Sequence, residues 1–382
     1  MKKSRVFKFI GFLLLMFMVQ GLLKFPVNAA TSVYKFDFGG GAAVSGYTKV
    51  SASLAYDKSK GYGFNTPANM KNVTATGTGI ESDAVQFVTY GITSTNTFDV
   101  DLPTGLYEIK VTLGNTSRAT VAAEGVYQIM NMTGNCASDT IQIPVTDGQL
   151  NLLVTEGKAG TAFTLAALEI SRISTDATMS KTIWVGGDST ACNYYPLATS
   201  VQTGWGQMLP SYIKNTAFQF RNMATGGQCA RGFRDDGQFA AIMKYIKPGD
   251  IFLLEFGIND TNPKNNETEA QFKEIMRDMV KQVKAKGANV VLVTPQGRVT
   301  DFDTAGVHSA VNRWYRNSTL ALASEENVAL VDLNVLSSKY FTSIGKTATT
   351  ALYMEDGLHF KHAGAAELAR LVSEELKRQK FY

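Results

Sequence analysis

The stretch Ile-Trp-Val-Gly-Gly-Asp-Ser-Thr, residues 183–190, joins a short apolar run to a turn that begins at two glycines. The apolar run predicts a buried strand, and Ser189 lies in the turn that follows it. Open α/β sheets bind ligands beyond the carboxyl ends of their strands, where glycines let the backbone approach closely. Ser189 is therefore our candidate nucleophile. An ordinary strand exit or N-cap is the alternative, so the prediction depends on partners elsewhere.

Downstream of this stretch, apolar runs alternate with segments of helical spacing. The runs lie at residues 183–185, 218–223, 251–256, 290–293 and 328–331. Apolar residues from Phe272 to Val283 recur every three or four positions and predict a helix that ends at Gly287, and a closing helix carries Leu368 and Val372 on one face. The alternation predicts an α/β fold for residues 182–382, a flavodoxin-like doubly wound parallel sheet with helices in layers on both faces.

Upstream of this stretch, residues 31–173 have a period of two instead. Residues 34–38 and 107–113 alternate apolar and polar side chains between turn signals, which predicts an antiparallel β-sandwich. Residues 174–181 are polar and without a period, so we interpret them as the linker. Tyrosines in glycine- and serine-rich loops of the sandwich either stack on sugar rings or only cap its edge; these are Tyr47, Tyr56, Tyr62 and Tyr90.

Residues 1–30 have the pattern of a secretory signal peptide. Four basic residues at 2–8 precede an apolar run at 9–19, and small residues near 29–30 suit cleavage. We therefore expect a secreted, extracellular protein with no membrane association after removal of the signal. Because this segment holds five basic and no acidic residues, its removal changes the formal charge from +4 to −1. No basic cluster with interleaved aromatics remains, which argues against nucleic acid as a partner.

The three cysteines permit at most one disulfide within the chain. Cys192 and Cys229 fall in segments expected beside one site and are the more plausible pair. Free buried thiols, with Cys136 among them, are the alternative.

Four further residues complete a set for acyl transfer with Ser189. Gly227 and Asn259 follow the second and third predicted strands, whose carboxyl ends meet at one sheet edge with that of the first. His359 is the candidate base, and Asp356, three residues earlier on a predicted helical turn, is expected to orient its ring. The backbone N–H groups of Ser189 and Gly227, with the Asn259 amide, are the candidate oxyanion hole.

A metal site is the competing interpretation of the last motif. Asp356, His359 and His362 have ligand side chains, but positions six apart on a helix diverge too far in direction for all three to converge on one ion. We expect no metal and no cofactor. His362 is expected to face solvent or to lie behind the site.

The motifs resemble a known superfamily. Residues 187–189, Gly227, residues 257–260 and residues 356–359 are similar to the four conserved blocks of SGNH, or GDSL, hydrolases. Residues 222–231 and 295–298 add a similarity to rhamnogalacturonan acetylesterases of carbohydrate esterase family 12, except that Gln228 and Cys229 stand where that family often has Arg-Ser. Residues 36–39 and 61–64 resemble galactose-binding-like modules.

The resemblance implies a serine esterase that removes acetyl groups from an acetylated plant cell-wall polysaccharide, with water as its second substrate. Rhamnogalacturonan, a pectin, is the expected backbone and acetylated xylan the near alternative. A lipid esterase of the same superfamily and a non-catalytic glycan-binding protein are the alternatives of other kinds. Candidate sugar contacts near the motifs are Arg298, Arg234 and Tyr194, with the neighbouring Tyr195.

Overall fold

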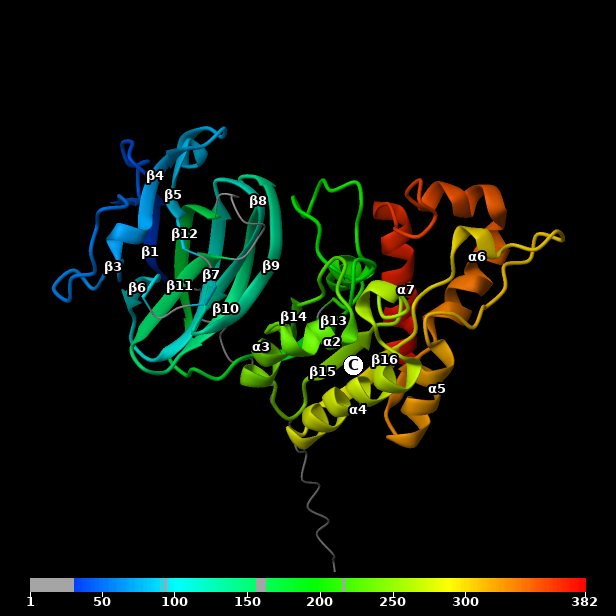
Figure 1. Cartoon of the computed structure of the whole chain (residues 1–382). Coiled ribbons are helices and arrows are strands. Elements are labelled where there is room, and N and C mark those ends of the chain that lie inside the picture. Colours follow the sequence, from blue (N-terminus) through cyan, green and yellow to red (C-terminus); the bar gives the residue numbers. More distant parts are fainter. Residues whose placement is uncertain (1–30, 90, 93–94, 156–162, 215–216) are drawn as a thin grey trace, which may run out of the picture.

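The computed structural model describes residues 31–89, 91–92, 95–155, 163–214 and 217–382. Two domains lie side by side, a β-sandwich formed by the N-terminal part and a sheet covered by helices formed by the C-terminal part (Figure 1). Residues 175–180 connect them. The predicted signal peptide lies outside the described residues.

The sandwich consists of two sheets that enclose an aromatic core. The first sheet contains β10 (Ser138–Val145), β7 (Gly105–Leu113), β12 (Phe163–Ser174), β1 (Thr31–Phe38), β2 (Thr48–Val50), β4 (Met70–Thr74) and β5 (Asp83–Phe87). The second contains β3 (Tyr62–Phe64), β6 (Phe98–Asp101), β11 (Gln149–Thr155), β8 (Asn115–Ala123) and β9 (Val126–Asn135). Phe36, Phe38, Phe64 and Phe98 are fully buried between the sheets, as the period-two pattern predicts.

One pair of strands departs from the antiparallel prediction. β2 pairs with β1 in parallel, with Phe36 opposite Thr48. The segment between these strands makes a crossover in place of a hairpin, and residues 39–47 contain no long apolar run that would have signalled it. Among the described residues of the sandwich, helical structure is limited to the short 3₁₀ turns η1 (Pro67–Asn69) and η2 (Gly79–Glu81).

The C-terminal domain has the doubly wound fold that the alternation predicted. Its five strands are all parallel, in the order β14 (Phe218–Asn222), β13 (Lys181–Gly186), β15 (Ile251–Glu255), β16 (Asn289–Val293) and β17 (Ala329–Val331). The first strand of this domain, β13, is thus second in the sheet, which is the flavodoxin-like order. The strand order changes direction at β13, which lies between β14 and β15, and Ser189 follows the carboxyl end of this strand.

Helices cover both faces because alternate residues of the strands point to opposite sides. Trp184, Phe252 and Leu254 face one layer, formed by α2 (Ala230–Asp235), α3 (Gln238–Tyr245), α4 (Glu269–Ala285) and α5 (Arg316–Glu325). Val185 and Leu253 face the other, formed by α1 (Trp205–Met208), α6 (Leu333–Leu352) and α7 (His362–Arg378). Short 3₁₀ turns complete the domain at η3 (Leu209–Ser211), η4 (Pro263–Asn265) and η5 (Val299–Asp301).

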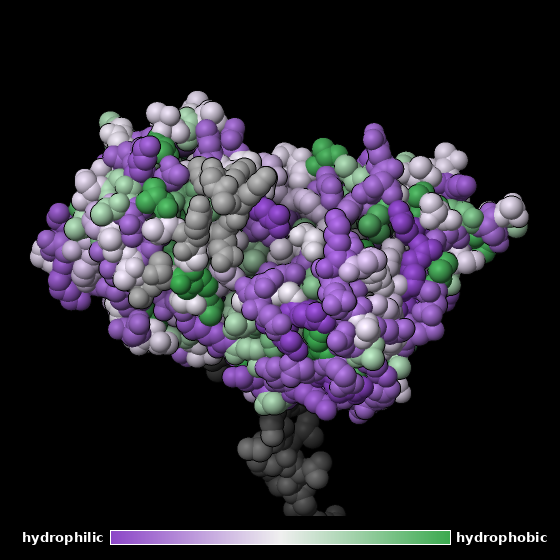
Figure 2. Space-filling view, viewed as in Figure 1, coloured by the Kyte–Doolittle hydropathy of each residue, from purple (hydrophilic) through white to green (hydrophobic). Residues whose placement is uncertain are grey.

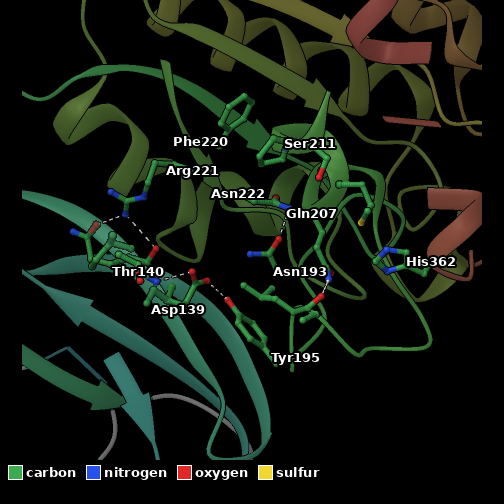
Figure 3. Close-up of a pocket in the computed structure, with 18 residues that line it drawn as sticks. Asp139, Thr140, Asn193, Tyr195, Gln207, Ser211, Phe220, Arg221, Asn222 and His362 are labelled. Atoms are coloured by element: carbon green, nitrogen blue, oxygen red, sulfur yellow. Dashed lines mark hydrogen bonds between the residues drawn. The ribbon is translucent and has the colours of Figure 1, made fainter. Parts of the chain in front are cut away.

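Polar contacts join the two domains. The buried Arg221 of β14 donates to the backbone carbonyls of Gln128 (3.2 Å) and Gln142 (3.3 Å) in the sandwich. Tyr195 donates its hydroxyl to Asp139 Oδ2 (2.6 Å), and Figure 3 shows both contacts meeting at the domain boundary. α3 also packs against β9. The sandwich is therefore anchored beside the loops that follow the parallel strands.

The surface and the cysteines add two observations. On the face shown in Figure 2, hydrophobic side chains form small separate spots among hydrophilic ones on both domains. Across the described residues, no helix combines the length and apolar character needed to cross a bilayer. Cys136, Cys192 and Cys229 are all free, so the Cys192–Cys229 disulfide is not formed and the free-thiol alternative describes this structure.

Candidate active site

Ser189 lies in the turn beyond the end of β13. Gly186, the last residue of β13, is closely packed: a Cβ there would lie 2.7 Å from the Phe233 ring, so a larger residue would force a shift. The backbone N–H groups of Ala191 and Cys192 donate to Asp188 O at 3.2 and 3.0 Å. The chain thereby reverses and presents the Ser189 side chain at the carboxyl edge of the sheet.

His359 links Ser189 to Asp356. His359 Nε2 lies 2.7 Å from Ser189 Oγ, and His359 Nδ1 lies 2.5 Å from Asp356 Oδ2. A ring that donates from Nδ1 to the carboxylate leaves Nε2 free to accept the serine proton. This is the hydrogen-bonded order that a serine nucleophile, a base and an orienting carboxylate require.

The turn that holds Asp356 differs from the helical turn expected from its spacing. Residues 354–359 form an irregular turn ahead of α7, and Asp356 Oδ1 accepts the backbone N–H groups of Leu358 and His359, each at 2.9 Å. These backbone hydrogen bonds, and not a helical turn, hold the Asp356 carboxylate beside His359. Partial burial opposes ionisation, but the bonds from the His359 ring and these N–H groups lower the pKa of Asp356 to about 2.

Gly227 and Asn259 lie with Ser189 around one cavity of about 550 Å³, which we name the Ser189 pocket. Gly227 has a φ of +80°, a left-handed conformation that favours glycine. Asn259 Nδ2 donates to the carbonyl of Gln228 at 2.9 Å, which ties the two predicted oxyanion loops together. The structure thus gathers all three predicted oxyanion donors at one site.

Asp260 braces the same loops from behind. Its two carboxylate oxygens accept the N–H groups of Ala230 (2.7 Å) and Gly257 (2.8 Å). Burial raises the pKa of Asp260 to about 7, against the opposing effect of these N–H groups. The Asp260 side chain therefore joins the loop after β14 to the loop after β15. Burial makes the ionised form of this carboxyl group unfavourable there.

Two buried acids beneath the nucleophile turn were not predicted as a pair. Asp188 Oδ1 accepts the N–H and hydroxyl of Thr190, both at 2.9 Å, and Glu255 Oε2 accepts from Trp205 Nε1 at 2.6 Å. Burial raises the pKa of both carboxyls, and in Glu255 the charge of Asp188 adds to this. An acidic residue inside the apolar run 251–256 is the sequence signal that could have drawn attention to Glu255.

The sandwich forms one wall of the Ser189 pocket, which the sequence did not predict. Arg118 of β8 and Asn131 and Thr133 of β9 line the pocket together with Ser189 and His359. A second cavity of about 440 Å³ follows along the domain boundary and shares Asn193 and Tyr195 with the first. The polar groups around the second cavity, including His362, appear in Figure 3.

The proposed sugar contacts differ in position. Tyr194 lines the Ser189 pocket and donates its hydroxyl to Ser189 O at 2.8 Å, and Tyr195 lines it as well. Arg298 lies behind the site, where it donates to the carbonyl of Asp356 at 3.0 Å. Arg234 forms ion pairs with Asp235 (2.7 Å) and Asp278 (3.7 Å) on the α2–α4 surface. Neither arginine lines the pocket, so their positions do not support sugar contact.

The three residues of the metal interpretation do not converge. Asp356 and His359 bind each other, whereas His362 is exposed at the start of α7 and lines the second cavity. Among the described residues, one group of side chains has the proximity to hold an ion, and it consists of Cys229, Asp260 and Glu267.

Comparison with known proteins gives a family for each domain. Residues 34–171 match the family described as beta-agarase/YXIM esterase-like, galactose-binding domain-like, and residues 185–367 match the GDSL-like lipase/acylhydrolase family. The galactose-binding-like resemblance of the sandwich and the SGNH resemblance of the second domain are both confirmed.

Several similar proteins are esterases by name. The uncharacterized esterase YxiM of Bacillus subtilis is 64% identical over 380 residues, 99% of each chain, and its crystal structure matches with a TM-score of 0.89 and 67% identity over 91% of this chain and 98% of that one. The probable rhamnogalacturonan acetylesterase YesY of B. subtilis is 30% identical over 208 residues, 52% of this chain and 94% of that protein. The rhamnogalacturonan acetylesterase RhgT of B. subtilis is 29% identical over 206 residues, 50% and 88%.

Proposed function

The chain belongs to the GDSL-like lipase/acylhydrolase family and is a carboxylic ester hydrolase, and we propose that it removes acetyl groups from acetylated rhamnogalacturonan through Ser189. The observation that carries the catalytic assignment is the hydrogen-bonded chain from Ser189 Oγ through His359 to Asp356. The names of the relatives YesY and RhgT support the choice of polysaccharide.

The geometry supports a two-step acyl transfer. Ser189 Oγ attacks the carbonyl carbon of the acetyl ester while its proton moves to His359 Nε2, which lies 2.7 Å away. The ring then gives this proton to the departing sugar oxygen, leaving an acetyl group on Ser189. Water, deprotonated by the same nitrogen, attacks the acetyl carbon. The bond from this carbon to Ser189 Oγ then breaks, the ring returns the proton to Oγ, and acetate is released. Asp356 remains ionised and stabilises the ring when it carries the proton.

Stabilisation of the oxyanion falls to the backbone and one amide. Ser189, Gly227 and Asn259 line the pocket from three different loops, and their two backbone N–H groups and one side-chain amide are the proposed donors. Donors that are held in place before reaction stabilise developing charge without reorganising, which is why such sites accelerate acyl transfer. The bond that Asn259 donates to Gln228 supplies that rigidity, together with the two that Asp260 accepts from Ala230 and Gly257.

The lining of the pocket favours a polar ester over a long acyl chain. Amide and hydroxyl side chains from both domains line it, among them Asn131, Thr133, Asn193, Gln202 and Asn259. A fatty acyl chain would leave such polar groups without hydrogen-bond partners. A sugar hydroxyl or ring oxygen can satisfy them.

The decisive experiment is a panel of esters treated with wild-type protein and Ser189→Ala. We expect acetate release from acetylated rhamnogalacturonan to exceed release from acetylated xylan, and nitrophenyl acetate to be cleaved faster than nitrophenyl decanoate. Ser189→Ala should lower turnover on the order of a million-fold. Preference for xylan or for decanoate would replace the proposed substrate, and acetate release retained by Ser189→Ala would falsify the nucleophile.

Export is part of the proposal and has its own test. The basic and apolar pattern of residues 1–30 supports it. Expression of the full chain in a secreting bacterial host should place protein in the medium with a new N-terminus near residue 30 or 31. Retention of residues 1–30 on the exported or cell-bound protein would contradict cleavage.

A further inference from the structure

We propose that the β-sandwich is part of the substrate-binding site, and that Arg118 on its β8–β9 hairpin binds the carboxylate of an acidic sugar in the bound polysaccharide. The proposal deepens the function given above and rests on it for the position of the acetylated sugar. It changes the role of the sandwich from a separate module to one wall of the Ser189 pocket. It also gives a physical basis for choosing a uronate-containing backbone over a neutral one.

The backbone of the hairpin is distorted where it faces the other domain. Arg118 has a φ of +76° and Asn131, on the neighbouring strand, has a φ of +49°. The pairing of β8 with β9 shifts register between Ser117 and Ala119 and again before Val121. Bulges of this kind re-aim side chains, and left-handed conformations in residues other than glycine persist where the surrounding structure holds them.

The distortion places Arg118 in the pocket that contains the nucleophile. Arg118, Asn131, Ser189 and His359 all line the same cavity, although residues 118 and 189 belong to different domains. Arg118 Nε donates to Asn131 Oδ1 at 3.0 Å, which fixes one edge of the guanidinium. Burial raises the pKa of Cys192 to about 12, and the positive charge of Arg118 acts on that thiol in the opposite direction. Cys192 directly follows the nucleophile turn.

The charge of Arg118 has no carboxylate partner in the protein. Among the ion pairs of the described residues, none includes Arg118, and its side chain is exposed. It is the one permanently charged side chain among the described residues that line the Ser189 pocket. Arg234 differs, since it forms ion pairs with Asp235 and Asp278.

The chemistry of a free guanidinium edge selects the ligand. Arginine presents paired N–H donors whose spacing matches the two oxygens of a carboxylate, and such bonds are stronger than those between neutral groups. Rhamnogalacturonan carries a carboxylate on its galacturonate sugars, whereas the xylose backbone of xylan carries none. An acetylated sugar at Ser189 with a uronate toward the sandwich would place the carboxylate on the side where Arg118 lies.

The test measures binding in the absence of turnover. Full-length Ser189→Ala is titrated in a calorimeter with a deacetylated rhamnogalacturonan oligosaccharide and with the same oligosaccharide after reduction of its carboxyl groups. We expect Arg118→Gln, added to Ser189→Ala, to raise the dissociation constant for the acidic ligand about 10-fold or more and to leave that for the reduced ligand within about twofold. Arg118→Lys should fall between the two.

Arg234→Gln is the matched control, because it removes an arginine that lies outside the pocket. It should bind both ligands like the Ser189→Ala parent. The proposal is overturned if Arg118→Gln weakens both ligands equally, if it weakens neither, or if the Ser189→Ala parent binds neither. Circular dichroism and the thermal midpoint establish that each variant is folded.

Failure of the proposed function gives a different result. If wild-type protein releases no acetate from acetylated rhamnogalacturonan while Ser189→Ala still binds the acidic oligosaccharide through Arg118, the function is wrong and the acidic subsite stands. If acetate is released and binding does not depend on Arg118, the function stands and the subsite is wrong.

Discussion

The two walls of the Ser189 pocket are held with different rigidity. On the catalytic side, His359 bonds to Ser189 at 2.7 Å and to Asp356 at 2.5 Å, and Asp260 ties together the loops behind Gly227 and Asn259. On the sandwich side, the exposed Arg118 side chain donates from Nε to Asn131 Oδ1 at 3.0 Å. One wall contains a network, and the other presents a flexible side chain on a distorted hairpin.

The difference corresponds to the tasks of the two walls. Bond-making steps lose rate when atoms are displaced by about an ångström, so the groups that move protons or bind an oxyanion must be fixed in advance. Recognition of a polymer tolerates adjustment, and a long side chain can follow its ligand. We therefore expect changes on the catalytic wall to lower turnover for every ester, and changes toward the sandwich to act on affinity and stability.

Among substitutions that leave Ser189 in place, Asp356→Asn should produce the largest effect. An amide at this position cannot accept in the same way from His359 Nδ1, so the ring loses its preferred tautomer and the stabilisation of its charged form. We expect kcat to fall about 10⁴-fold on both nitrophenyl acetate and acetylated polysaccharide. Asp278→Asn, on α4 and remote from the pocket, is the control. A fall in kcat that differs between the two substrates would contradict the different roles that we assign to the two walls.

Asp260→Asn should change how stability depends on pH. The folded pKa of about 7 lies above the value of an unfolded aspartate, so between these pH values the folded state holds a proton that the unfolded chain has lost. Binding of this proton stabilises the folded state at low pH. The stabilisation is lost as the pH rises toward 7, and the loss in the free energy of unfolding is ~4 kcal/mol if Asp260 titrates alone.

Urea unfolding at several pH values measures that slope. Because asparagine also disturbs the N–H groups of Ala230 and Gly257, the absolute stability of Asp260→Asn will differ from wild type, and the slopes are the quantity to compare. The variant should lose less stability than wild type between pH 4 and pH 7. Parallel curves would show that Asp260 is ionised throughout this range.

Asn259→Ala should reduce turnover by about 10²- to 10³-fold, the range for loss of one oxyanion donor. The decrease should appear in kcat with acetate and polysaccharide substrates alike, with KM little changed. Steady-state kinetics on both substrates measure it. A rise in KM confined to the polysaccharide would make Asn259 a sugar contact. It would contradict the expectation that changes on the catalytic wall act on turnover.

Tyr195→Phe should have the smallest effect and acts where the walls meet. It removes the hydroxyl that donates to Asp139 Oδ2 across the domain boundary at 2.6 Å. We expect a loss of about 1–2 kcal/mol in the free energy of unfolding, typical of a bond to a charged acceptor. Urea denaturation checks this, and an unchanged midpoint would show that the contact adds nothing to domain docking.

Local patterns were sufficient to predict much of this protein. The five parallel strands, the helix from Phe272 to Val283 and the aromatic faces of the sandwich follow from periods of two and 3.6, which depend on neighbouring residues alone. The loops that carry Ser189, Gly227 and Asn259 could be assigned to one edge because every parallel strand ends in the same direction. The parallel pairing of β1 with β2 had no local signal and was missed.

Contacts between residues distant in the chain could not be predicted from such patterns. Arg118 lines the same pocket as Ser189 because one domain docks on the other through Arg221 and Tyr195, and no period or motif encodes that orientation. Glu255 interacts with Asp188 because the strands β13 and β15, which are distant in the sequence, pair within the C-terminal domain. Local periodicity and motif chemistry were enough to define the strands and the set of reacting groups, whereas the shape of the pocket depended on packing between domains.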